Sequence, residues 1–216
     1  MPSLRQLLAA HAPLLLIDAA SARIQVGWLA KDEPARWANS TDEAGVGIFR
    51  SVEALGIDPG AAGALVFCDG PGSVLGVRTA AMALRVWHEL RPRPLFAYHS
   101  LAVVAAALNR PGTTVIADAR RDSWHGVAAT VPPGPLRRIA SADLGTAGEL
   151  VMPEGFRHWT PLPANVTLTP YSLADVLPRV ADQPDLFRAT DAPDAFLHEE
   201  PSYAKWTPQL HRAPAP

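Results

Sequence analysis

Continuous and alternating apolar positions predict a mixed α/β structure in the first half of the chain. Residues 14–17 form a short apolar run that suits a strand buried on both faces. Ile24, Val26 and Trp28 alternate with polar or small residues, which is typical of a half-buried strand. The other elements expected here are an edge strand at 34–38, a helix capped by Thr41 or Asp42 that carries Val46, Phe49, Val52 and Leu55, a strand at 64–68, a helix at 74–90, a strand at 94–98 and a helix at 100–107. The first six elements therefore follow a βββαβα order.

The opening pattern recurs 100 residues later in the chain. Residues 115–119 match residues 15–19, and in both places an apolar run ends in Asp-Ala before a turn and an alternating segment. We therefore predict two related lobes, an N-terminal lobe at 1–110 and a degenerate C-terminal lobe with an extended tail at 111–216. Of the 22 prolines, 14 lie at or beyond Pro132, so regular structure is expected to thin out in the second lobe.

The predicted helix at 74–90 carries more apolar surface than one sheet can cover. Its apolar arc spans roughly 240°, compared with the ~100° stripe of a helix that packs on a single partner. Small residues line one side and allow close helix packing, and an aromatic side chain near the end is suited to anchor a contact. We interpret this side as a protein interface formed by Leu75, Gly76, Thr79, Ala80, Ala83, Val86 and Trp87. The alternative is that the proline-rich half of the same chain covers it.

Composition and charge narrow the classes of partner. The chain has 216 residues, 48% of them hydrophobic and 19% charged, which is enough to bury a sizeable core. A net charge of −2 leaves no broad basic footprint, so strong unaided binding to nucleic acid or to an anionic membrane is not expected. The single cysteine, Cys68, cannot form an internal disulfide, and a reducing cytoplasm fits best.

Two aspartates carry the strongest catalytic hypothesis that the residues allow. Asp18 and Asp118 each end an apolar strand, and in a two-lobed fold they would face one cleft and share a magnesium ion. The simpler interpretation is that each carboxylate stabilises its own turn by hydrogen bonds. The alanines and arginines that follow the two aspartates do not suit a phosphate-binding loop.

A glycine-rich turn at 70–76 follows a strand and precedes a helix. Gly70, Gly72 and Gly76 do not match the spacing of a dinucleotide-binding motif, and no acidic strand end follows ~20 residues later. Ser73 is better explained as the cap of the helix that begins at residue 74. The seven histidines include no pair at i, i+4, so no metal site is expected.

Several segments together resemble the TsaB (YeaZ) family. The most specific is Gly70–Arg78, GPGSVLGVR, which is similar to that family's GPGSFTGLR-type signature. The others are residues 15–29, His99-Ser100-Leu101, residues 117–120 and Pro201-Ser202-Tyr203. The resemblance implies a duplicated actin-like or RNase H-like fold of the ASKHA superfamily. It also implies a noncatalytic partner of a TsaD-like transferase that makes threonylcarbamoyladenosine (t6A) on tRNA, and a homodimer, with the helix at 74–90 in both interfaces.

The chain departs from that family near its first turn. The family usually has Asp-Thr-Ser there, whereas Asp18 is followed by Ala19 and Ala20, and a histidine common near the start of the first helix is absent between residues 41 and 55. We therefore predict a cytoplasmic, noncatalytic scaffold that binds a TsaD-like subunit or a second copy of itself through residues 74–90. It would use no cofactor or metal, would contact tRNA only indirectly and would not bind membranes.

Two enzymatic alternatives follow from the same resemblance. A weak ATP-binding ATPase or kinase-like enzyme of the ASKHA type would hold magnesium and ATP in a vestigial nucleotide cleft formed by Asp18, Ser21, Gly70, Gly72, Ser73 and Asp118. A glycoprotease-like metallopeptidase, suggested by older descriptions of the family, would require a bound metal.

Overall fold

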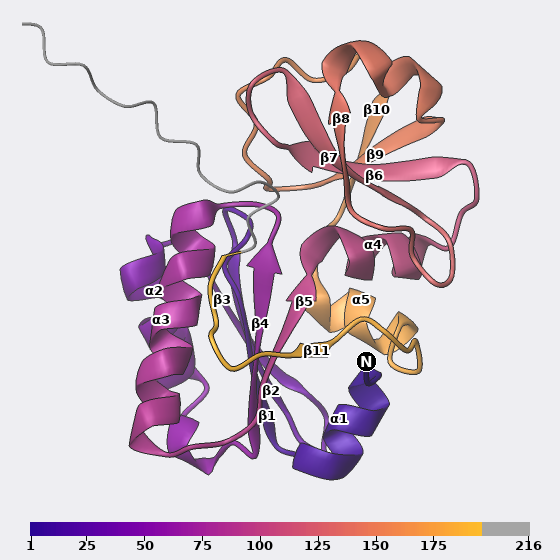
Figure 1. The fold of residues 1–216 in the computed structure, drawn as a ribbon. Helices are drawn as coiled ribbons and strands as arrows, with labels where there is room; N and C mark the ends of the chain where they lie inside the picture. The colour runs from indigo at the N-terminus through magenta and orange to yellow at the C-terminus, as the bar shows by residue number, and fades with distance from the viewer. Residues whose placement is uncertain (196–216) are drawn as a thin grey trace, which may run out of the picture.

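The chain forms two mixed β-sheets with helices packed against them (Figure 1). A computed structural model describes residues 1–195. The first sheet, in the order β11-β5-β4-β1-β2-β3, consists of β1 (Leu14–Asp18), β2 (Ile24–Leu29), β3 (Arg36–Ser40), β4 (Ala64–Gly70), β5 (Leu95–His99) and β11 (Arg188–Ala189). The second sheet, in the order β10-β9-β6-β7-β8, consists of β6 (Thr113–Asp118), β7 (Ser123–Ala128), β8 (Arg137–Ala140), β9 (Glu149–Pro153) and β10 (Val166–Thr169).

The two sheets share one pattern of strand neighbours and directions. In the first sheet β1, β2 and β3 form an antiparallel meander, while β1 runs parallel to β4 and β4 to β5. In the second sheet β6, β7 and β8 form the same meander, while β6 runs parallel to β9 and β9 to β10. The matching segments 15–19 and 115–119 thus lie at corresponding places, each at the end of the central strand. β11 comes from the C-terminal half of the chain but pairs with β5, so it extends the first sheet.

The helices differ between the two sheets. They are α1 (Leu4–His11), α2 (Ala44–Ala54), α3 (Val74–Leu90), α4 (Ser100–Leu108) and α5 (Leu173–Arg179). α2 and α3 lie side by side over one face of the first sheet, and α4 lies between the two sheets (Figure 1). In the second sheet the β8–β9 connection holds only the 3₁₀ helix η2 (Ser141–Thr146), and the β9–β10 connection at 154–165 holds no helix. Pro161 and Pro163 lie in that connection, where missing amide donors disfavour a helix.

The main hydrophobic core packs around the first sheet and extends to one face of the second sheet. Every residue of β1 and β4 is buried. Because side chains alternate along a strand, Val115 and Ala117 of β6 face this main core, while Ile116 faces away from it. That far side of the second sheet is packed by a smaller cluster of Ile116, Trp124, Leu144, Leu150 and Met152.

The first helix, α1, precedes the earliest strand that the pattern predicts. A capping box fixes its start, because the Ser3 side chain accepts the amide N–H of Gln6 while the Gln6 side chain accepts the N–H of Ser3.

Within residues 1–195, no helix combines the length and the hydropathy that a bilayer crossing requires.

The start of α2 differs from the sequence prediction. The helix begins at Ala44, and its N-cap residue Glu43 makes no side-chain capping bond, so the predicted caps at 41 or 42 were wrong. Of the four apolar residues that mark this helix in the sequence, Val52 and Leu55 are buried, whereas Val46 and Phe49 are 45% and 49% exposed. The helix instead buries Ile48 and its neighbours against the sheet, because Gly47 allows a close approach to β2 and β3.

Candidate functional site

The glycine-rich turn between β4 and α3 packs against the turn that follows β1. A Cβ on Gly72 would lie 2.3 Å from the carbonyl oxygen of Ala20, and one on Gly76 would lie 2.1 Å from that of Ala19. The amide of Ser73 donates a hydrogen bond of 2.7 Å to the same Ala20 oxygen. These glycines therefore allow one backbone to approach another rather than cradle a phosphate.

Ser73 is the N-cap residue of α3, as the sequence predicts. Its side-chain oxygen accepts a hydrogen bond of 3.3 Å from the amide of Gly76, so the prediction of a helix cap is confirmed. Gly70 and Gly72 have φ angles of 116° and 151°, which side-chain-bearing residues rarely adopt.

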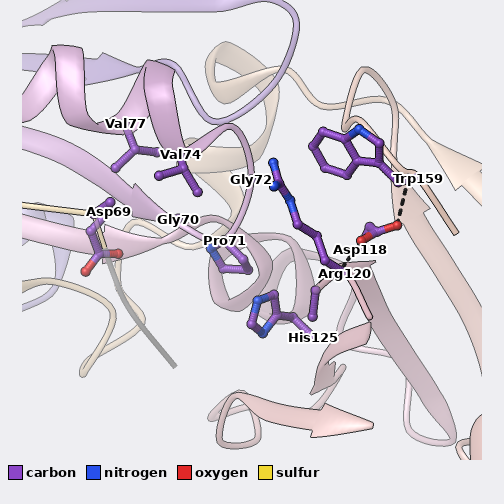
Figure 2. A pocket seen from close by; sticks show the side chains of 12 residues that line it. Asp69, Gly70, Pro71, Gly72, Val74, Val77, Asp118, Arg120, His125 and Trp159 are labelled. Carbon is purple, nitrogen blue, oxygen red and sulfur yellow. Dashed lines mark hydrogen bonds between the residues drawn. The ribbon is translucent and has the colours of Figure 1, made fainter. Parts of the chain in front are cut away.

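A small cleft separates this turn from the second sheet (Figure 2). Its cavity volume is ≈ 110 Å³, well below the ~300 Å³ at which pockets for small organic ligands begin. The walls come from Asp69, Gly70, Pro71, Gly72, Val74 and Val77 on one side, Asp118, Ala119, Arg120, His125 and Trp159 on the other, and Ala195. Asp118, Gly70 and Gly72 line this cleft, whereas Asp18, Ser21 and Ser73 do not.

Asp18 is fully buried beside the cleft rather than inside it. One carboxylate oxygen accepts hydrogen bonds of 2.6 Å from the hydroxyls of both Tyr98 and Tyr171, and the other accepts the amide of Ala20 at 3.0 Å. Burial, followed by the charge of Asp18, raises the pKa of both tyrosines well above its usual value. Both carboxylate oxygens of Asp18 thus have hydrogen-bond partners from this chain, and of the two strand-ending aspartates only Asp118 lines the cleft.

Asp118 is half-buried and binds backbone amides instead. One oxygen accepts the N–H of Arg120 at 2.5 Å, and the other accepts the N–H groups of Trp159 and Thr160 at 2.8 Å each. Burial by itself would raise the pKa of Asp118, but the amides of Thr160, Trp159 and Arg120 outweigh burial and lower it. Both aspartates bond the amide two residues ahead, which confirms the interpretation that each stabilises its own turn.

Ser21 also serves its local turn. Its hydroxyl donates to the carbonyl oxygen of Arg23 at 2.8 Å and accepts the amide of the same residue at 3.1 Å. Among residues 1–195, no cluster of three or more His, Cys, Asp or Glu side chains has a geometry that would hold a metal ion.

A second buried carboxylate, Asp69, was missed by the sequence analysis. It is the penultimate residue of β4, accepts a hydrogen bond of 2.7 Å from Nδ1 of His99, and forms an ion pair with Arg188. The pair with Arg188 ties β11 to the first sheet. An acidic residue after a buried strand was visible in the sequence, but its partners lie 30 and 119 residues away.

The small residues of α3 do not form an exposed interface. Gly76, Ala80 and Ala83 are buried by this chain itself, so assigning them to a partner contact was wrong. The reason is that α3 packs closely on β4, β1 and α2, and only small side chains fit there. Trp87 is half-buried, with its ring edge-on to Phe49 at a centroid distance of 6.1 Å.

The other predicted interface residues lie on the outer side of α3. Leu75 is 76% exposed and Val86 is 52% exposed. Thr79 is partly exposed, and its hydroxyl donates to the carbonyl oxygen of Leu75. Together with Met82, 54% exposed, and Leu90, 78% exposed, they form a line that we call the α3 seam: Leu75, Thr79, Met82, Val86 and Leu90.

Comparison with known proteins identifies the fold. No protein-family model and no curated protein matches the chain. Among solved structures, YeaZ from Pseudomonas aeruginosa has a TM-score of 0.55 and 17% sequence identity, covering 77% of this chain and 90% of its own. An uncharacterized protein from Pseudomonas aeruginosa with similarity to peptidase YeaZ has a TM-score of 0.55 and 19% identity, covering 78% and 89%.

These matches define a class of mixed α/β proteins with two mixed sheets. Within that class, the chain has the fold of YeaZ, the protein also called TsaB. The family resemblance carried by the GPGSVLGVR turn is thereby confirmed at the level of the fold. One segment of that resemblance, Pro201-Ser202-Tyr203, lies outside the described residues.

Proposed function

We propose that this chain is a noncatalytic TsaB-like subunit that supports a TsaD-like transferase in forming t6A on tRNA. The observation that carries the proposal is the α3 seam. Its members follow one another at intervals of four, three, four and four residues, close to the 3.5-residue spacing at which helices pack against helices. An exposed line of this kind is typical of a surface that is covered by another protein.

The neighbouring helix widens this apolar surface. Val46 and Phe49 of α2 are about half exposed, and Phe49 contacts Trp87 of α3. α2 and α3 lie side by side over one face of the first sheet, and only the start of α3, with Val74 and Val77, lines the cleft toward the second sheet (Figure 1). A TsaD-like subunit or a second copy of this chain can therefore approach without disturbing the contact between the two sheets.

The cleft supports a scaffold rather than a nucleotide-driven enzyme. The carboxylate of Asp18, which the enzymatic alternative would use to hold magnesium, is already bonded to two tyrosines and an amide. The shared strand pattern of the two sheets supports a duplicated actin-like or RNase H-like fold, with lobes at 1–110 and 111–216 and a degenerate second lobe. We propose cytoplasmic action without a cofactor, in which the TsaD-like partner carries the transfer chemistry.

Substitution of the α3 seam tests the proposal. In Val86→Lys a charge would be buried in the contact, so we expect association to weaken at least ~10-fold. Unfolding in urea should change by less than ~0.5 kcal/mol, because the side chain is half exposed in the single chain. The matched control is Leu168→Lys on β10, where the leucine is 49% exposed.

Light scattering of the purified chain and copurification with the TsaD-like subunit of the same organism provide the measurements. The wild type and Leu168→Lys should form a dimer or a complex, while Val86→Lys should form neither at the same concentration. A wild-type chain that stays monomeric and does not bind the TsaD-like subunit would refute the proposal, as would equal association of all three.

A further inference from the structure

A cationic and aromatic patch lies at the second-sheet side of the cleft, outside the α3 seam. We call Arg120, Arg121 and Trp159 the Arg–Trp patch. Trp159 is 60% exposed, which is unusual for a large aromatic side chain. The guanidinium carbon of Arg120 lies 4.2 Å from the centroid of its ring, within the ~6 Å range of a cation–π contact. Figure 2 shows Arg120 extending beside Trp159 toward the turn at Gly72.

One carboxylate organises the patch. Asp118 bonds the amide of Arg120 on the β6–β7 turn and the amides of Trp159 and Thr160 on the β9–β10 connection. The two segments are about 40 residues apart in sequence, and this side chain holds them at a fixed separation. The arginine and the indole are therefore positioned before any ligand arrives.

The turn that carries the arginines has an unusual backbone. Arg120, Arg121 and Asp122 have φ angles of 62°, 51° and 52°, so three successive residues other than glycine lie in the left-handed region. Residues other than glycine adopt this conformation at an energetic cost, and strain of this kind gathers at functional sites. Hydrogen bonds from Ser123 and Arg138 to the carbonyl oxygen of Arg120 hold the turn in place.

The charge of the patch is available to a ligand. Within residues 1–195, neither Arg120 nor Arg121 has a carboxylate ion-pair partner, and both side chains are exposed. Both line a shallow pocket together with Trp159, and the exposed side chains of Arg157 and His158 directly precede that tryptophan in the chain. Unpaired guanidinium groups bind phosphate, and an exposed indole stacks on a nucleobase.

We infer that the Arg–Trp patch binds a nucleotide unit, with the base stacked on Trp159 and the phosphate bonded to Arg120 or Arg121. This goes beyond the proposed function, in which the chain contacts tRNA only through its partner. The unit can come from a free mononucleotide or from a single-stranded RNA. The pocket is open to solvent rather than enclosed, and an open surface suits a longer strand better than a single captured nucleotide, which favours the RNA.

Fluorescence anisotropy of a labelled ten-nucleotide single-stranded RNA, with the full chain at low salt, tests this inference. Trp159→Ala and Arg120→Ala should each weaken binding ~5-fold or more, because one stacked base contributes ~1–3 kcal/mol. Arg120→Ala should also lower the slope of log K against log salt by ~0.7, the value for one phosphate contact on a single strand. The control Lys31→Ala removes one exposed cation from the β2–β3 turn, at the opposite end of the first sheet, and should change binding less than 2-fold.

Uridine monophosphate serves as the competitor that separates the two sources. If uridine monophosphate at millimolar or lower concentration displaces the RNA, the site exists and its ligand is a free nucleotide. Resistance to displacement, together with the losses in the two variants, supports it with an RNA strand. Absence of RNA binding, or equal binding by wild type, Trp159→Ala and Arg120→Ala, overturns the inference. The inference is also overturned if those variants bind RNA normally but no longer bind the TsaD-like subunit, because the patch is then a protein contact.

The outcome is independent of the proposed function. The α3 seam is tested by association of proteins, and the Arg–Trp patch is tested by binding of RNA to the single chain. Val86→Lys, which should abolish association, is expected to bind the RNA as the wild type does.

Discussion

The two sheets have the same strand order, yet the aspartates at corresponding strand ends have opposite surroundings. Asp18 is fully buried and accepts two tyrosine hydroxyls, whereas Asp118 is half-buried and accepts backbone amides. The difference comes from what the rest of the chain places beside each strand. Tyr98 of β5 and Tyr171 before α5 cover the first aspartate, while an irregular connection reaches the second.

The two sheets also differ in the helices that pack against them. The first sheet has α2 and α3 on one face, and the second has only a short 3₁₀ helix and a loop at the equivalent connections. The first sheet thus has a packed core with an outer apolar seam, whereas the second sheet presents a turn and a loop that hold Arg120 and Trp159. A repeated topology therefore does not imply a repeated role.

The largest expected effect separates the two aspartates. Asp18→Ala leaves the hydroxyls of Tyr98 and Tyr171 buried without their acceptor, so we expect it to lower the free energy of unfolding by about 3–5 kcal/mol. Asp118→Ala should cost about 1 kcal/mol, because its amide partners are closer to solvent. Urea denaturation of both variants measures the difference. Equal losses would show that burial does not distinguish the two positions.

An intermediate effect is expected where α3 meets the turn after β1. Gly76→Ala brings a Cβ to 2.1 Å from the carbonyl oxygen of Ala19, a rigid backbone atom, and should destabilise the fold by about 1–3 kcal/mol. Gly45→Ala in α2 is the matched control, because no atom lies within 4 Å of its added Cβ. Alanine favours helix over glycine, so the control should gain up to ~1 kcal/mol. Thermal unfolding that ranks the two in the other order would contradict the close packing of α3.

The smallest effect is the acid dependence of Asp118. Its pKa in the folded chain lies below the ordinary value, so below about pH 4 the unfolded chain binds the proton more readily than the folded one. The stability contributed by this carboxylate is fully present above that pH and is lost as the pH falls through the folded pKa. Between pH 5 and pH 3 the wild type should therefore lose more stability than Asp118→Asn, as measured by urea unfolding at each pH. Parallel pH profiles would show that the amide bonds do not favour the charged form.

Local sequence patterns accounted for much of the fold. The apolar runs of β1 and β4, the alternation of β2 and the cap at Ser73 each lie within a few neighbouring residues, so chain geometry alone made them readable. The start of α2 was misjudged because Thr41 and Asp42 are good caps that the chain does not use. The width of the apolar arc of α3 was readable too, but not which side of it faces a partner.

The sequence by itself determined the strands β1 to β7, the helix after the glycine turn and the repeat of the Asp-Ala ending, because these depend on periodicity and on short-range bonds. Only the tertiary structure decided that Gly76, Ala80 and Ala83 face inward while the α3 seam faces outward. It alone joined Asp18 to tyrosines 80 and 153 residues away, and Asp69 to Arg188. Such contacts depend on how distant segments pack together, and no local pattern in the chain encodes their pairing.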